Sequence, residues 1–301
     1  MVKIINKKEN VLDGITGFVE YWDFSKANSS YEARVNAVTQ VASICYQSPK
    51  ALDSVSLFNR LQAESGGLPS SSYEFVPVLL KLDSEWLKPR CDSLKDLDSL
   101  QFHKVLRLQF KNCFKYGEAV ADINRDTYLL TNLRALIEDV GEEDSLRYFN
   151  TCEEEQKIIK DNFKVFLFNV DLSTRSQMVR HRVNWQELSR RYVSGKKKKF
   201  EFYISKKMEN VYSFDKGDLV EYSTEEVINQ CLDHYDEAIE QGIKPEEARR
   251  ILPQGMLTQI WGGFQPNQLE GFFKLRLDKH SQKEIRLIAQ AMRDLLDENK
   301  D

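Results

Sequence analysis

Three basic side chains stand together at Arg180, His181 and Arg182, directly after an apolar pair. Like charges this close repel one another, so a negatively charged ligand would stabilise them. Arginine suits phosphate, because its planar fork of donors makes charge-assisted hydrogen bonds that contribute about 1.5–3 kcal/mol each. Residues 189–191, which follow after a six-residue spacer, add a hydroxyl and two more guanidiniums. These residue types and their spacing favour a binding site for a phosphate ester over a solvated basic surface.

The charge of the chain is distributed unevenly. The formal net charge is −4, yet residues 175–199 hold nine Lys or Arg and one acid, Glu187. This segment therefore carries +8 and the rest of the chain −12. A basic segment in an acidic protein indicates a local anionic ligand. A second interpretation stays open at this point, in which the segment binds nucleic acid and Trp185 and Tyr192 stack on its bases. We expect residues 196–199, four lysines, to form a solvated loop.

The sequence around this segment resembles flavin-dependent thymidylate synthases. That family carries an R-H-R triplet followed by S-x-R-Y, and Arg180 and Ser189 begin the corresponding motifs here. Other blocks match in the same order: residues 200–204 downstream, A-R-R-I-L-P at 248–253, L-R-L-D-K-H-S-Q-K-E-I at 275–285, and weaker blocks at 42–43 and 71–75. A lone R-H-R has little meaning, but several ordered blocks together are a specific signal.

The resemblance implies an enzyme that methylates carbon 5 of the uracil ring of dUMP and so produces dTMP. Methylenetetrahydrofolate is implied as the source of the carbon, and FAD, recharged by NADPH, as the source of the hydride. In the family no cysteine attacks the pyrimidine, so catalysis is expected to depend on positioning and on electrostatic stabilisation of the ring. A homotetramer whose subunits share the active sites is implied as well.

The resemblance also assigns site residues, position by position. Catalytic roles fall on Arg276, Arg180 and Ser189, and Arg276 is expected to polarise the uracil. For dUMP binding it implies Gln177, Arg180, Glu187, Leu188, Ser189, Arg190, Arg191, Arg249 and Arg276. For FAD binding it implies Ser43, Ser71, Glu74, Arg180, His181, Arg182, Gln265, Gly271 and His280. No metal site is expected. Because His280 precedes a helix start, where the positive end of the dipole disfavours a charged imidazole, we expect it to be neutral.

The chain departs from the family pattern in two places. The spacer between Arg182 and Ser189 has six residues, whereas the family usually has seven. Gln265, Asn267 and Gly271 stand where the family commonly has Asn, Arg and Asn near the flavin. These departures leave open a second hypothesis on the same fold, in which a diverged member acts on another pyrimidine nucleotide.

Hydrophobic periodicity indicates the elements that must position these residues. Apolar residues at helical spacing predict helices over 31–46 and 52–64 and after residues 223 and 281, and shorter apolar runs predict strands at 73–82, 165–170 and 200–204. This mixture predicts an α+β fold. The resemblance implies a central, mostly antiparallel sheet with long helices, in a single domain over 1–301. Residues of about 83–160, with amphipathic stretches at 100–114 and 127–140, are interpreted as a helix-rich insertion.

Length and composition set the outer limits. The chain has 301 residues, of which 41% are hydrophobic and 30% charged, so it can bury a sizeable core. No apolar run is long enough to span a bilayer, and the first residues lack the apolar stretch of a signal peptide. We therefore expect a cytoplasmic protein with no membrane partner, whose five cysteines stay reduced and, lacking a C-x-x-C pair, bind no zinc.

Overall fold

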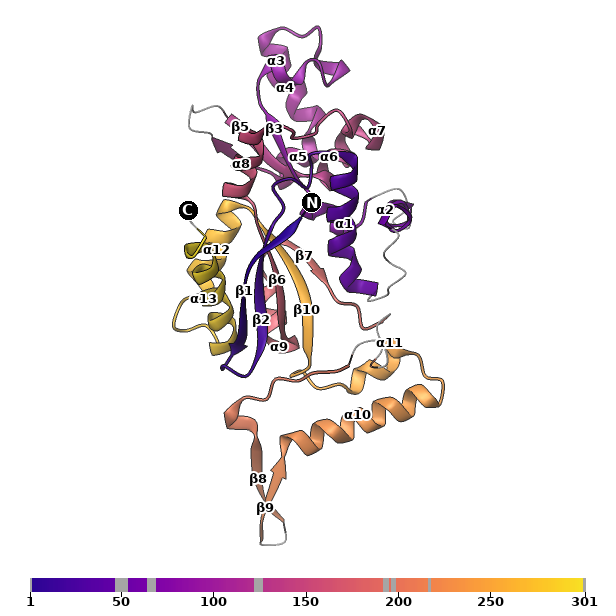
Figure 1. Ribbon diagram of the computed structural model, residues 1–301, viewed down its shortest axis with the longest axis vertical. Helices are drawn as coiled ribbons and strands as arrows, with labels where there is room; N and C mark the ends of the chain where they lie inside the picture. The colour runs from indigo at the N-terminus through magenta and orange to yellow at the C-terminus, as the bar shows by residue number, and fades with distance from the viewer. Residues whose placement is uncertain are drawn as a thin grey trace.

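Five antiparallel strands form the central sheet of this protein, seen here in a computed structural model (Figure 1). The structure describes residues 2–46, 54–63, 69–121, 127–191, 195, 199–215 and 218–299. In spatial order the strands are β1 (Lys3–Leu12), β2 (Thr16–Asp23), β6 (Lys164–Asp171), β10 (Leu257–Phe264) and β7 (Asn184–Glu187). Every neighbouring pair is antiparallel. Together with the helices around the sheet, this confirms the expected α+β class and the antiparallel central sheet.

Strand β6 shows how the sheet separates two cores. Successive side chains of a strand point to opposite faces, so Val165 and Leu167 face one way while Phe166 and Phe168 face the other. On the first face the core includes α1 (Tyr31–Tyr46), which starts and ends at the residues that its periodicity predicts. On the second face the core includes α12 (Pro266–Arg276) and α13 (Lys283–Asp297). The buried aromatic rings on both faces fix the sheet between its helices, since each contributes about 1.5–3 kcal/mol.

The hairpin between β1 and β2 turns at two residues with left-handed backbone. Asp13 has φ 53° and Gly14 has φ 73°. Asp-Gly is a preferred pair for such a turn because glycine adopts positive φ at no steric cost. Sequence periodicity gave no strand here, since β1 is only partly buried and its apolar residues do not alternate regularly. The Asp13-Gly14 dipeptide was the sequence signal that could have predicted this hairpin.

Residues 77–162 form a second layer above the sheet (Figure 1). Three strands, β3 (Pro77–Lys81), β5 (Thr127–Asn132) and β4 (Glu118–Ala121), make a small antiparallel sheet in the order β3-β5-β4. Its helices and 3₁₀ turns are α3 (Ser84–Leu87), η3 (Asp92–Leu94), α4 (Ser99–Gln109), α5 (Lys111–Tyr116), α6 (Leu133–Val140), α7 (Glu142–Ser145) and α8 (Glu153–Asn162). The segment is rich in helices as expected, but the helical interpretation of 127–140 was wrong in its first half. Residues 127–132 are β-branched, aromatic and apolar residues that pair with β3 instead.

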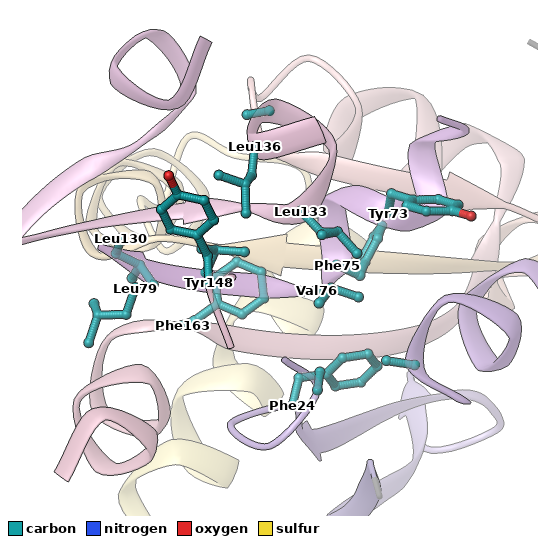
Figure 2. Packing of buried hydrophobic residues seen from close by; sticks show 14 of the residues in the cluster. Phe24, Tyr73, Phe75, Val76, Leu79, Leu130, Leu133, Leu136, Tyr148 and Phe163 are labelled. Atoms are coloured by element: carbon teal, nitrogen blue, oxygen red, sulfur yellow. The ribbon is translucent and has the colours of Figure 1, made fainter. Parts of the chain in front are cut away.

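This second layer shares its core with the first face of the sheet. Figure 2 shows Leu79, Leu130 and Tyr148 packed beside Phe75 and Phe163. Within the second layer a buried polar contact fixes residue 150 against β3, because the Asn150 side chain both accepts from Leu79 N, at 3.0 Å, and donates to Leu79 O, at 2.8 Å. An edge strand such as β3 has backbone groups that face no other strand, and the Asn150 amide pairs with the N–H and C=O of Leu79.

The remaining elements lie around the site and below it. They are α2 (Ser54–Ala63), η2 (Ser71–Phe75), α9 (Leu172–Met178), η4 (Lys206–Met208), β8 (Asn210–Asp215), β9 (Asp218–Ser223), α10 (Thr224–Glu240), α11 (Pro245–Ala248) and η5 (Arg249–Ile251). The strand expected at 200–204 is absent from these described residues, where a single bridge joins Phe202 to Met256. The strand expected at 73–82 begins later, as β3, because η2 precedes it. Among the described residues, no helix has both the length and the apolar character that a membrane span needs.

Candidate functional site

Residues 177–182 form the end of α9 and the turn behind it, and the last turn of α12 lies against them. Arg276 Nε donates to His181 Nε2 at 2.7 Å, and Arg276 Nη2 donates to the carbonyl oxygen of Gln177 at 2.9 Å. Gln268 Nε2, one helix turn into α12, donates to the carbonyl oxygen of Arg182 at 3.0 Å. The structure therefore brings together residues about a hundred positions apart that the sequence predicted to share a site.

His181 is held in its neutral form. Because Arg276 Nε is a donor, the Nε2 atom of His181 must accept, which leaves the ring proton on Nδ1. The ring also lies 4.8 Å from the ring of Phe272. Burial lowers the pKa of His181 below its ordinary value, and the nearby charge of Arg276 lowers it further. An imidazole in this state can hydrogen-bond a ligand without adding charge.

We call Arg180, Arg182 and Arg276 the guanidinium cluster. Arg180 and Arg182 are exposed and Arg276 is partly exposed. Burial lowers the pKa of Arg276 and the charge of Arg180 lowers it further, so these two cations repel each other. Within the described part of the chain, none of the three forms an ion pair with a carboxylate. The cluster therefore presents uncompensated positive charge in a form that suits phosphate.

A pocket of about 480 Å³ lies at the start of α9. Four segments line it: the start of α9, the end of β7 with the residues after it, η5, and the start of β10. Its lining residues are Leu172, Arg175, Glu187, Leu188, Ser189, Arg190, Arg249, Arg250, Leu252, Gln254, Met256 and Thr258. Five of the predicted dUMP residues thus meet in one cavity, which we call the Glu187 pocket.

The Glu187 carboxylate is the acidic centre of this pocket. Burial raises the pKa of Glu187 above its ordinary value, while the Arg175 guanidinium opposes that rise. Arg175 Nε lies 2.8 Å from Glu187 Oε1, and both side chains are about 29% exposed. The ion pair keeps a half-buried carboxylate able to accept hydrogen bonds from a ligand.

Two more arginines, Arg250 of the pocket and Arg191 outside its lining, are paired with carboxylates too. Arg191 Nε lies 3.4 Å from a carboxylate oxygen of Glu246, and Arg250 Nε lies 3.0 Å from one of Glu247. Arg249 Nε donates to the carbonyl oxygen of Glu246 at 3.3 Å. Arg190 is buried over the ring of Phe200, 4.8 Å from its centroid, and burial lowers the pKa of Arg190. Only some of the arginines predicted to bind phosphate therefore carry a charge that no carboxylate balances.

Strand β7 presents its polar side chains in two directions. Gln186 Nε2 donates to Cys45 Sγ at 2.8 Å, and Ser71 Oγ donates to Gln186 Oε1. Asn184 Nδ2, on the same side of the strand, donates to the carbonyl oxygen of Glu74 at 2.8 Å. Glu187 points instead to the pocket. Two predicted flavin residues, Ser71 and Glu74, are thereby brought to the strand that carries the predicted nucleotide residues.

The thiol of Cys45 links α1 to this strand. Cys45 Sγ donates to the carbonyl oxygen of Glu187 at 3.0 Å while it accepts from Gln186. Burial raises the pKa of Cys45 above its ordinary value. A protonated thiol with both partners satisfied packs the strand against the helix and is a poor nucleophile.

Four predicted flavin residues lie apart from these contacts. Ser43 Oγ donates to the carbonyl oxygen of Gln40 in its own helix, at 2.7 Å. His280 is exposed, and its Nδ1 lies 2.7 Å from Asp278 Oδ1. Gln265 is buried and donates to the carbonyl oxygens of Tyr116, at 2.9 Å, and Leu130, at 3.3 Å.

The fourth, Gly271, lies in the middle of α12, and a Cβ built on it would meet no atom within 4 Å. Of the other residues singled out in the sequence, Tyr192 and 196–198 lie outside the described residues.

Sequence reasoning missed Arg175, Cys45, Gln186 and Thr258, which complete these contacts. Arg175 stands within the basic segment, two positions before Gln177, and its charge was counted without a role. The position of Glu187 on β7 would have pointed to it, since a half-buried carboxylate requires a partner. Cys45, Gln186 and Thr258 gave no signal of their own.

Comparison with known proteins places this geometry in a family. The model of the family described as thymidylate synthase complementing protein matches residues 145–299, which is 155 of the 301 residues. The chain belongs to this family. The match takes in the guanidinium cluster and the whole Glu187 pocket. The weaker blocks with Ser43, Ser71 and Glu74 lie outside it.

Individual members of the family match over shorter or weaker stretches. The flavin-dependent thymidylate synthase of Aquifex aeolicus is 31% identical over 146 residues, which cover 45% of each chain. That of Wolbachia pipientis is 30% identical over 195 residues, 60% of this chain and 62% of the relative. That of Thermotoga neapolitana is 32% identical over 131 residues, 42% of this chain and 59% of the relative. The chain thus spans about half of the length of the relatives it matches.

Proposed function

We propose that this protein is an FAD-dependent thymidylate synthase, which methylates dUMP to dTMP with methylenetetrahydrofolate and NADPH. The observation that carries the proposal is the guanidinium cluster. Arg180, Arg182 and Arg276 hold uncompensated charge, near a pocket whose carboxylate is paired with an arginine, in a chain that belongs to the family. Anionic nucleotides complement such a surface.

The residues present fit a flavin nucleotide. The cluster offers guanidinium donors for phosphate, and neutral His181 offers a hydrogen bond to a ring or a ribose. Gly271 has open space beside its backbone, as close approach of a flat ring would require. We propose Arg180, His181, Arg182 and Gly271 as the principal contacts, with Ser43, Ser71, Glu74, Gln265 and His280 as further ones. Bound FAD would supply the hydride in its reduced form.

The Glu187 pocket is proposed for dUMP. Glu187 accepts hydrogen bonds, Ser189 contributes a hydroxyl, and Arg249 at the rim contributes charge. Proposed contacts are Gln177, Arg180, Glu187, Leu188, Ser189, Arg190, Arg191, Arg249 and Arg276. In this arrangement Arg276 is fixed by His181 and Gln177, so its guanidinium can stabilise negative charge on the uracil ring without reorganising.

Shared sites in a homotetramer are part of the proposal. Two apolar side chains beside the cluster are exposed, Val179 at 39% and Leu275 at 59%. A second subunit placed there would bury them and close the open side of the site. We also propose that 1–301 is a single domain and that residues of about 83–160 are an insertion into it, since the chain enters and leaves that layer beside the sheet, near Phe75 and Phe163. A cytoplasmic location belongs to the same proposal.

One observation favours a second candidate on the same fold, a member that acts on another pyrimidine nucleotide. The donors of Gln265 are both taken by the backbone of residues 116–130, which leaves a predicted flavin contact occupied. A flavin site that departs from the family pattern in this way fits a diverged member with another pyrimidine nucleotide as substrate. A role in nucleic-acid binding has less support, because the pocket arginines meet carboxylates of their own chain.

The test is release of tritium from carbon 5 of labelled dUMP by the purified protein with FAD, NADPH and methylenetetrahydrofolate. Release that requires every component, and that falls in Arg180→Ala but not in Arg293→Gln, would support the proposal. Arg293 lies on the exposed face of α13 and serves as the matched arginine. No release by a protein that binds flavin would redirect the search to another pyrimidine nucleotide. No release and no flavin binding would refute both candidates.

A further inference from the structure

A two-stranded hairpin projects from the lower end of the molecule (Figure 1). It consists of β8 and β9, and within the described residues it pairs with no other strand. Five of its large apolar side chains are exposed: Val211, Tyr212, Phe214, Leu219 and Tyr222. A hairpin of two strands is marginally stable by itself in water. Its apolar residues therefore require a partner.

Both faces of the hairpin carry this apolar surface. Paired residues share a face, so Phe214 and Leu219 lie together on one side and Val211 and Tyr222 on the other. Phe214 is 77% exposed, and together with Tyr212 on the same face it exposes about 200–340 Å² of aromatic surface. Exposed apolar patches of a few hundred Å² on soluble proteins are often interaction sites.

The hairpin and the helix that follows it are strongly acidic. Residues 205–241, which we call the acidic arm, contain ten acids and three lysines. Three acids of the arm, Glu209, Asp218 and Glu221, are exposed, and none of them enters an ion pair within the described residues. A partner that binds the arm should therefore be apolar and basic. This excludes polyanions such as nucleic acid.

A surface with that chemistry lies on the same chain. Residues 99–117 contain four Lys or Arg and no acid. Lys104, Arg107, Lys111 and Lys115, which we call the basic face, are exposed on α4 and α5, and no ion pair in the described residues includes them. Leu108, at 71%, and Tyr116, at 47%, are exposed among them. The basic face thus complements the arm in both charge and apolar character.

The two surfaces lie at opposite ends of the long axis, with α4 at the top of Figure 1 and β8 and β9 at the bottom. One chain therefore cannot bring its own arm to its own basic face. We infer that the acidic arm docks on the basic face of a second copy of this chain. Two copies side by side and antiparallel make this contact twice, which closes the pair by two-fold symmetry.

The test measures mass rather than turnover, so its outcome does not depend on the proposed function. One variant reverses the charge of the acidic arm, with Glu209→Lys, Asp218→Lys and Glu221→Lys. Another reverses the charge of the basic face, with Lys104→Glu, Arg107→Glu and Lys111→Glu. Sedimentation velocity of the full chain should show a twofold loss of mass for either variant. A variant that combines both reversals should recover the wild-type mass.

Further variants guard against a mere loss of folding. Phe214→Ser with Leu219→Ser should halve the mass while circular dichroism stays unchanged, whereas Ile15→Ser, at an exposed position of the β1–β2 turn, should change neither. Masses that are unaffected by both charge reversals would overturn the inference, as would a combined variant that stays small. Binding of a polynucleotide that the face reversal abolishes without a change in mass would assign the basic face to nucleic acid and also overturn it.

Discussion

The Glu187 pocket and the guanidinium cluster are both rich in arginine, but they differ in whether carboxylates balance the arginine charge. In the pocket, Arg175 donates to Glu187, and Arg191 and Arg250 meet carboxylates at the rim. In the cluster, Arg276 is held by an imidazole nitrogen and a carbonyl oxygen. Neutral acceptors fix a guanidinium in place without cancelling its charge. The comparison indicates that the cluster attracts an anion while the pocket selects its ligand by shape and hydrogen bonding.

Replacing Arg276 should have the largest effect. In Arg276→Lys the charge remains, but the fork that binds His181 and Gln177 is lost, so the cation is no longer fixed. We expect kcat for tritium release to fall by about 10²–10³, as when one donor to a developing charge is removed. A variant with wild-type kcat would show that charge alone is sufficient and would contradict the role given to the fixed geometry.

Breaking the pair in the pocket should have a smaller effect that depends on pH. In Arg175→Met the burial of Glu187 is no longer opposed, so the pKa of Glu187 rises further. The acidic limb of the kcat/KM profile should move to higher pH, with about a tenfold loss for each unit of that shift on the acid side. Arg175→Lys should return the acidic limb most of the way to its wild-type pH, and Glu187→Gln should abolish the limb. An unchanged profile in Arg175→Met would show that Glu187 does not need to be ionised.

The protonation of His181 tests how the cluster holds Arg276. Burial and Arg276 both lower the pKa of His181, so the folded chain binds its proton at a lower pH than the unfolded chain. The associated stability is complete above the ordinary pKa of about 6.5 and is lost as the pH falls. In NMR titrations, Arg276→Met should raise the pKa of His181 part of the way towards that value. An unchanged pKa of His181 in this variant would show that the Arg276 guanidinium does not lie beside the imidazole in solution.

The smallest expected change is at Gly271. Alanine fits the open space beside α12 and should stabilise the protein by about 0.5–1 kcal/mol, because glycine is unfavourable within a helix. If a flavin ring occupies that space, the added methyl group should weaken FAD binding at the same time. Thermal unfolding and flavin fluorescence titration measure the two effects. Higher stability with unchanged FAD affinity would remove Gly271 from the proposed flavin site.

The sequence predicted some elements well because their signal is local. Helix α1 repeats its apolar residues at helical spacing, and β6 is a short apolar run, so both appeared where expected. Residues 127–132 were mistaken for helix because their strand form depends on pairing with β3, some fifty positions away. Strands β1 and β2 were missed because β1 is only partly buried and because the partly buried face of β2 also carries large apolar residues, Phe18 and Trp22, which hides its alternation in the sequence.

The site was predicted through its motifs rather than its geometry. The guanidiniums of Arg180 and Arg182 stand out as charge in the sequence, but the contact of Arg276 with His181 depends on how α12 meets α9. Arg175 was missed because it lies on α9 while its partner Glu187 lies on strand β7, beyond the turn that follows the helix. Gln265 shows the opposite case. It occupies a position that the motif assigns to the flavin site, but its side chain binds the backbone of the second layer.

Equilibrium binding of FAD tests the central claim, that the guanidinium cluster is the anion-binding centre, most directly. Flavin fluorescence would be titrated with wild-type protein, Arg180→Gln, Arg182→Gln and the control Arg293→Gln, at low and high salt. Kd should rise at least tenfold in Arg180→Gln and Arg182→Gln and stay unchanged in the control, and wild-type affinity should fall as salt increases. Equal affinities in all four proteins would contradict the claim.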